Sequence, residues 1–198
     1  MTVASEKLHK KSLQRHEKGL QRTGKLESHT FTRASDIFPK LDEFFTQHIE
    51  RWDTTPTPSI FLQTKHREFY RRMIENLDPT GWLRFTVLLL DGKMIAAHLG
   101  WFYLGRFYWY KPTYDIRLKT KSPGEVLLKR VIEQAVADKA EEFDFLIGDE
   151  TYKSRFATKT RKLVWLEIDD SWLSATSKRI KRAVYRRLHI QRRKQSAR

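Results

Sequence analysis

The stretch KSPGEVLLKRVIEQAVADKAEEFDFLI, residues 121–147, decides the fold. It places Ser122 at a helix cap, Pro123 at the first helical position and Glu125 three residues after the cap. This is the pattern of a capping box, and it predicts the start of a helix. The apolar run at 143–147 predicts a short strand after that helix. A helix between two strands of one sheet implies a parallel pair with a right-handed connection.

Turn residues and hydrophobic periodicity predict the elements on either side of this stretch. Asp91-Gly92 and Leu104-Gly105 separate apolar runs, which predicts a meander of three antiparallel strands. The fold class is therefore α/β (α+β), a mixed sheet in the order β-α-α-β-β-β-α-β-α-β with basic helical extensions at both ends. The expected elements are a helix at 5–22, a strand at 26–32, a helix capped by Ser35 or Asp36, a helix at 64–77, strands at 82–90, 93–103 and 106–111, the helix from 122 to about 139, a strand at 143–147, a short helix at 150–157 and a strand at 162–168.

Composition and charge divide the chain into a body and two basic ends. A chain of 198 residues, 39% of them hydrophobic, can bury one good core. The formal net charge of +15 lies at the ends: residues 1–25 hold seven Lys and Arg against two Glu, residues 178–198 hold ten and no acid, and residues 26–177 hold 22 of each sign. We expect a basic helical arm at 1–25, a globular domain at 26–170 and a basic C-terminal helix or tail at 171–198. The tail predicts salt-sensitive binding to a polyanion or an anionic membrane surface.

Several kinds of protein are excluded by what the sequence lacks. No stretch approaches the roughly 18 consecutive apolar residues of a membrane span. The first 25 residues lack the apolar run of a secretory signal, so we expect a cytoplasmic protein. The absence of cysteine excludes disulfides, thiolate nucleophiles and cysteine-ligated zinc. The seven histidines are scattered without the spacing of metal ligands, so no metal site is expected.

Three groups of short strings follow one another along the chain and carry a resemblance. They are HLG (98–100) with GRFYWY (105–110), PTYD (112–115) with SPG (122–124) and LL (127–128), and FDFL (143–146) with GDE (148–150) and YK (152–153). With this order and spacing, the chain resembles the acyltransferases of the GNAT superfamily. In detail it is similar to the acetyltransferase domain of the cellulose-biosynthesis-associated (CelD-like) type, which is related to the Fem-type aminoacyl transferases.

The resemblance implies a GNAT-like acyltransferase domain that uses acetyl-CoA as its acyl donor. A helix N-terminus favours phosphate through its unpaired amide groups and its partial positive charge. The Glu125 carboxylate opposes that role unless it points aside, and Lys119 and Lys121 would have to offset its charge. The residues that the resemblance implies for the donor are Ser122, Pro123, Gly124, Val126 and Leu127. The implied acceptor is a small amine or amino sugar of envelope or polysaccharide metabolism, and a partner domain would replace the upstream half that this branch usually has.

Transfer to an amine needs a neutral amine, a polarised carbonyl and a proton for the departing thiolate. The catalytic candidates are His98 as general base, Glu150 as the group that receives the amine, and Tyr152 as proton donor. For the acceptor the candidates are Asp149, Lys153, Tyr110 and Tyr114. Structural alternatives stay open: His98 could be a hydrogen-bonded core residue, Tyr110 and Tyr114 could pack across strands, Asp149 could cap a helix and Lys153 could be a solvated charge.

Two other functions stay open at this point. The first is a catalytically inactive or half-complete transferase domain that acts as a partner-binding module. The second is a basic nucleic-acid-binding protein that uses the tail, although only Tyr185 interrupts its basic run and stacking on bases needs more aromatic side chains. Binding of acetyl-CoA distinguishes an enzyme from the nucleic-acid binder, and turnover distinguishes it from the inactive module.

Overall fold

The computed structural model describes residue 8, residues 11–53 and residues 55–164. The chain divides into two compact units, Met1–Thr158 and Lys159–Arg198, and all of the described helices and strands lie in the first. Residues 162–164, at the start of the last predicted strand, are not in a strand, and 165–168 lie outside the described residues, as does the predicted tail at 171–198. No helix within the described ranges is long and apolar enough to span a membrane.

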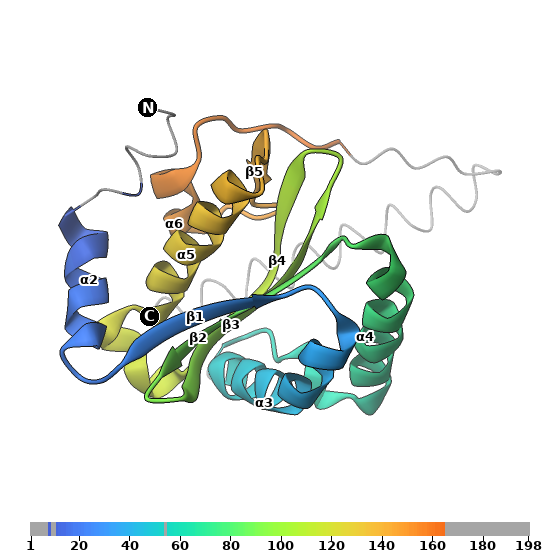
Figure 1. The fold of residues 1–198 in the computed structure, drawn as a ribbon, viewed down its shortest axis with the longest axis horizontal. Coiled ribbons are helices and arrows are strands. Elements are labelled where there is room, and N and C mark those ends of the chain that lie inside the picture. Colours follow the sequence, from blue (N-terminus) through green and yellow to red (C-terminus); the bar gives the residue numbers. More distant parts are fainter. Residues whose placement is uncertain (1–7, 9–10, 54, 165–198) are drawn as a thin grey trace, which may run out of the picture. The chain divides into compact units, whose positions relative to one another are not determined.

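The centre of the first unit is a five-stranded mixed sheet (Figure 1). Its strands pair in chain order, antiparallel up to β4 and parallel between β4 and β5, which confirms the predicted meander and the parallel pair. At both hairpin turns, Asp91-Gly92 and Leu104-Gly105, the two central residues have positive φ, as tight two-residue hairpins require. The strands are β1 (Leu26–Phe31), β2 (Leu83–Leu90), β3 (Lys93–Tyr103), β4 (Arg106–Tyr114) and β5 (Glu142–Asp144).

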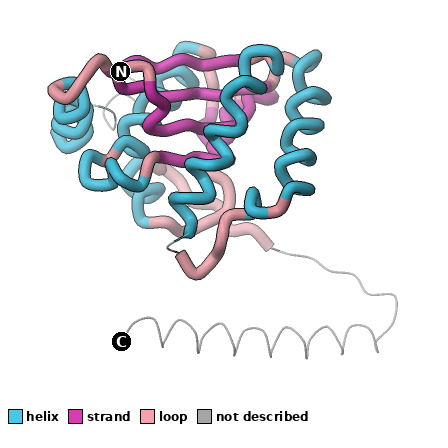
Figure 2. Tube along the Cα trace, turned by 90° about the horizontal axis from the view of Figure 1, so that it is seen from below, coloured by secondary structure: helices cyan, strands magenta, loops and turns pink. Residues whose placement is uncertain are grey.

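Helices cover both faces of the sheet (Figures 1 and 2). Side chains alternate between faces along a strand, so Val87 and Ala97 lie in one hydrophobic cluster while their neighbours Leu88 and Ala96 lie in the other. The first cluster belongs to α3 and α4, and the second to α2 and α5. The helices are α2 (Lys11–Gln21), α3 (Ala34–Asp53), α4 (Thr64–Leu77), α5 (Pro123–Ala137) and α6 (Thr151–Phe156), with short 3-10 turns at Ile60–Leu62, Asp78–Thr80 and Ile116–Lys121.

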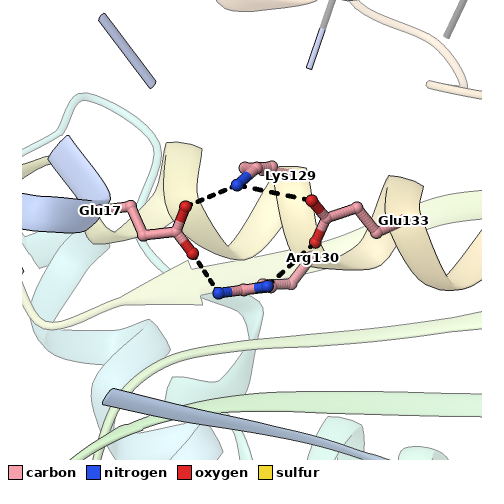
Figure 3. Close-up of polar contacts among 4 residues, drawn as sticks. All are labelled: Glu17, Lys129, Arg130 and Glu133. Atoms are coloured by element: carbon pink, nitrogen blue, oxygen red, sulfur yellow. Dashed lines mark hydrogen bonds and ion pairs between the residues drawn. The ribbon is translucent and has the colours of Figure 1, made fainter. Parts of the chain in front are cut away.

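Helix α2, predicted as a leading arm, packs against α5. Leu13 and Leu20 have no exposed surface and join the cluster around α5. The buried carboxylate of Glu17 forms ion pairs with Lys129, at 2.5 Å, and with Arg130, and Glu133 pairs with both cations (Figure 3). A carboxylate that is taken out of water needs such partners. The apolar face of α2 is too narrow for an isolated helix, and α5 supplies the surface that stabilises it.

Local expectations were wrong at the start of α3 and at the end of β5. Helix α3 begins at Ala34, before the predicted caps, because the Asp78 carboxylate accepts the Ala34 N–H at 2.8 Å. Strand β5 ends at Asp144 rather than at residue 147, because the Asp144 carboxylate accepts the Leu146 N–H at 2.7 Å and Leu146 has φ 57°.

Candidate active site

Strand β4 has an open edge beyond the point where β5 leaves it. The parallel ladder joins only Arg106–Tyr108 to Glu142–Asp144, and β4 then continues to Tyr114 without a partner strand on that side in the described chain. Pro112 has no amide hydrogen, and its carbonyl accepts a hydrogen bond from Arg51 Nη1 at 2.9 Å. The parallel pairing with β5 therefore covers only the first three residues of β4.

A β-bulge lies where β4 passes this point. Between the pairs Leu99–Lys111 and Trp101–Tyr108, β4 has one residue more than β3, so two residues of β4 face Gly100. A Cβ at Gly100 would lie 2.2 Å from the Tyr108 carbonyl oxygen, so only glycine fits there. The bulge leaves a backbone amide outside the regular ladder and bends the strand.

His98, predicted as a general base, is built into this bulge. Its side chain is completely buried and stacks on Trp109 with ring centroids 4.3 Å apart. Its Nε2 accepts the Tyr110 N–H at 3.1 Å, which satisfies an amide of the bulge itself. Burial lowers the pKa of His98 to about 3, so the ring is neutral at pH 7. This geometry gives His98 a structural role within the sheet.

The first turn of α5 differs from the predicted capping box. Ser122 has a left-handed backbone, with φ 53°, and its side chain makes no cap hydrogen bond. Its carbonyl instead accepts the N–H groups of Glu125 and Val126, at 3.1 and 3.3 Å. The Gly124 N–H is left without an acceptor among the described residues, and Pro123 has no N–H to offer. Of the unpaired amides expected in this first turn, the described structure therefore leaves that of Gly124.

The side chains in this turn face different surroundings. Val126 and Leu127 have no exposed surface and belong to the core, so they shape the turn from behind. The carboxylate of Glu125 forms an ion pair with Arg155 of α6, at 2.5 Å, and His16 Nδ1 of α2 lies 3.4 Å from it. Lys119 and Lys121, expected to offset Glu125, have no ion pair with it in the described structure.

Tyr114 and Arg51 meet beside Gly124. A Cβ at Gly124 would lie 3.0 Å from Tyr114 Cδ1, so the ring lies against the first turn of α5. The Arg51 guanidinium is 4.4 Å from the centroid of the same ring. Burial lowers the pKa of Arg51, while Tyr114, Tyr152 and Glu150 act in the opposite direction. Arg51 therefore reaches the open edge of β4 from α3.

Helix α6 presents Tyr152 to the same edge. The Trp109 indole N–H donates to the Tyr152 hydroxyl at 3.0 Å, so the phenolic hydrogen is available to another acceptor. Burial raises the pKa of Tyr152, which keeps the phenol protonated at neutral pH. A half-buried phenol with an available hydrogen is suited to proton donation.

The turn before α6 is held by Lys153. Its side chain is only 10% exposed, and Nζ lies 2.7 Å from Glu150 and donates to the Ile147 carbonyl at 3.0 Å. Lys153 is therefore not the solvated charge of the structural alternative, and its ammonium group has partners within the protein. The carboxylate of Glu150 is 54% exposed, and Asp149 is exposed.

The predicted residues thus fall into two sets. Around the open edge of β4 lie Tyr114, Gly124, Tyr152 and Glu150, together with Arg51, which the sequence reasoning missed. On the other face, the hydroxyl groups of Tyr110 and Tyr70 are hydrogen-bonded at 2.7 Å. Within the described residues there is no group of three or more side chains that could hold a metal ion.

Comparisons with known proteins agree with this architecture. A family model described as "Acetyltransferase (GNAT) domain" matches residues 7–154. The aminoglycoside N-acetyltransferase AAC(6')-Iy, solved in complex with CoA, has 9% identity and a TM-score of 0.51, over 74% of this chain and 96% of that chain. The structure of AAC(6')-Iy with the bisubstrate analogue CoA-S-monomethyl-acetylneamine has the same identity and TM-score, over 74% and 99%.

A more distant structural neighbour is the ribosomal-protein-S18-alanine N-acetyltransferase from Escherichia coli, with 12% identity and a TM-score of 0.48, over 67% of this chain and 74% of that chain. Comparison with curated protein sequences gives no match. At identities this low, the structural likeness shows the fold alone.

Proposed function

Because the chain belongs to the acetyltransferase (GNAT) domain family, we propose that it is an acyl-CoA-dependent N-acyltransferase, most simply an acetyltransferase, that transfers the acyl group directly to a small amine. The observation that carries the proposal is the open edge of β4, with Tyr152 beside it and, at one end, the Gly124 N–H, which has no acceptor among the described residues. The edge offers free backbone groups, an amide that can bind a phosphate and a proton donor. Acyl transfer from a thioester needs these three parts.

The residues beside this edge fit CoA. The Gly124 N–H and the partial positive charge of the α5 N-terminus suit a phosphate, and Lys119 and Lys121 add positive charge in the preceding turn. Ser122 and Pro123 set the path of the backbone, and Val126 and Leu127 support it from the core. The neighbouring fold of AAC(6')-Iy was solved with CoA, which supports the same donor here. When bound, the thioester supplies the activated acyl group.

Tyr152 is the residue that we assign to protonation of the departing thiolate. Its oxygen accepts the Trp109 indole N–H, so its own hydrogen is available to another acceptor. Its raised pKa keeps this hydrogen on the phenol until it is needed. No residue has to form a covalent bond to the acyl group.

Glu150 is the residue that we assign to the acceptor amine, with Asp149 beside it. The carboxylate of Glu150 is more than half exposed and can attract a cationic amine and take up its proton directly or through water. Lys153 holds that carboxylate in place by an ion pair. We propose that Lys153 acts on the acceptor indirectly, by positioning Glu150. His98 holds the bulge, so we do not assign it the role of base.

The acceptor we propose is a small amine or an amino sugar. The support is the resemblance to the CelD-like type and to the Fem-type transferases, together with a neighbouring fold whose enzyme acetylates aminoglycosides. We place Tyr114 on the donor side and Tyr110 in the support of β4. The same proposal includes a cytoplasmic location, domain boundaries near 25 and 170, a partner domain and binding of polyanions by 178–198. The support for these four points is the sequence.

A thermal-shift series with CoA thioesters tests this function. A ligand at one hundred times its dissociation constant adds about 2.7 kcal/mol to the free energy of unfolding, which corresponds to roughly 5–10 °C for a chain of this size. Release of free CoA with a panel of amino sugars and small amines then measures turnover. Binding without turnover would favour the inactive module, and absence of binding would refute the proposed donor.

A further inference from the structure

Glu125 presents a physical problem for a phosphate site in the first turn of α5. It follows Gly124 in the chain, and its carboxylate is attracted to the same helix N-terminus as an anionic ligand. In a capping box this carboxylate would bind the N–H of the cap residue. Here the Ser122 N–H already donates to the Lys119 carbonyl at 3.1 Å, so that position is closed to Glu125.

Arg155 gives the carboxylate a different partner. Its two terminal nitrogens lie 2.5 and 3.2 Å from the two oxygens of Glu125, a bidentate pair between α6 and α5. The side chains are 38% and 20% exposed, so water screens this pair only in part. His16 approaches from α2 at 3.4 Å, and the carboxylate is thus held between two helices.

The other cations of this region do not replace Arg155. Arg117 pairs with Asp115 at 2.8 Å. Lys129 and Arg130, on the next turn of α5, each pair with Glu17 of α2 and with Glu133 of α5. Lys119 is exposed and lies before the helix. Within the described chain, therefore, Arg155 is the only lysine or arginine that forms an ion pair with Glu125.

We propose that Arg155 is a positioning residue for the acyl donor: by holding the Glu125 carboxylate, it leaves the first turn of α5 able to accept the phosphate groups of CoA. The inference rests on the proposed function. It explains why a carboxylate is tolerated beside Gly124, and it assigns α6 a part in donor binding as well as in proton transfer. Arg155 acts here through Glu125 and needs no contact with the donor.

Four proteins test this role by calorimetric titration with CoA: wild type, Arg155→Gln, Glu125→Gln and the double variant. Arg155→Gln should weaken CoA binding at least tenfold, because the carboxylate then lacks its cation. The double variant should return to within about threefold of wild type, and Glu125→Gln alone should bind at least as tightly as wild type. Pantetheine, which has no phosphate, should bind all four proteins equally.

The control is Arg71→Gln, which removes an arginine from the Arg71–Asp42 ion pair of the α3 and α4 face and changes the net charge in the same way. It should leave the affinity for CoA unchanged. If Arg155→Gln fails to fold, Glu125→Gln still tests the same charge, and a loss of affinity greater than threefold in that variant overturns the inference. Unchanged binding by Arg155→Gln, or a double variant as weak as Arg155→Gln, also overturns it. A wild-type protein that does not bind CoA refutes the proposed function itself.

Discussion

Replacement of Gly124 by glutamate should weaken CoA binding while leaving the fold at least as stable. Gly124 is the residue in the first turn of α5 whose N–H lacks an acceptor within the part of the chain that the structure describes. A carboxylate there would lie close to any phosphate bound to that amide. Two unit charges about 6 Å apart interact by roughly 3 kcal/mol at an effective dielectric constant of about 20, which corresponds to about one hundredfold in affinity. Screening at this half-buried position reduces the effect, so we expect between tenfold and one hundredfold.

The effect on stability has the opposite sign. Glycine is the poorest helix former after proline, and replacing it by glutamate gains roughly 0.5 kcal/mol within a helix. A negative charge at the helix N-terminus adds about 0.3–1 kcal/mol. Against this stands the Tyr114 ring, whose Cδ1 would be 3.0 Å from the new Cβ and has to move by a few tenths of an ångström.

Gly124→Gln is the matched control, because it has the same size and the same contact with Tyr114 but no charge. The dissociation constants of both variants for CoA are measured by calorimetry, and their free energies of unfolding by urea denaturation. We expect Gly124→Gln to bind within about threefold of wild type. If the glutamate and glutamine variants bind CoA within twofold of each other, the phosphate does not lie at this amide and the reasoning is refuted.

The other predictions concern the proton donor, α2 and the buried histidines. Tyr152→Phe should lower kcat at least tenfold with little change in the KM for the donor. Since burial raises the pKa of Tyr152, the wild-type rate should not decline through loss of this proton until the pH exceeds about 10. A decline at lower pH that Tyr152→Phe abolishes would contradict this. Leu13→Ala should reduce the free energy of unfolding by about 2–5 kcal/mol in urea denaturation, whereas an arm outside the core would lose less than about 0.5. Burial lowers the pKa of His48 and of His98 to about 3, so the unfolded chain binds more protons between pH 6.5 and 3 and stability should fall as the pH falls through this range. Each histidine contributes up to about 1.4 kcal/mol per pH unit, and His48→Gln should flatten the slope of unfolding free energy between pH 7 and 5; an unchanged slope would show that His48 is not the source.

The strands and the main helices could be predicted because their signals are local. Two Gly-containing turns and the apolar runs between them define the meander, and the proline after Ser122 defines the start of α5. The start of α3 could not be predicted, because it is set by Asp78, which lies 44 residues after Ala34. The packing of α2 was missed for the same reason, since Glu17 finds Lys129 across 112 residues.

The site could be predicted where it is made of backbone and of neighbouring residues. The strings around Gly124 and Tyr152 led to the first turn of α5 and to α6, which the structure describes beside the open edge of β4. Arg51 gave no signal, because a basic residue in the last turn of a helix is favourable in any helix. Arg155 looked like a surface charge, and its pairing with Glu125 depends on how α6 returns to α5.

The open edge of β4 also bears on how this protein behaves at high concentration. A strand with unpaired N–H and C=O groups is a template for strands of other molecules, and such edges lead to aggregation. Pro112 lies within this edge and has no amide hydrogen to offer, while Arg51 occupies its carbonyl. A small ligand can therefore still bind the edge, but a strand from another molecule cannot form a continuous ladder of hydrogen bonds with it. Pro112→Ala would therefore be expected to make the protein more prone to self-association, which light scattering during concentration would detect.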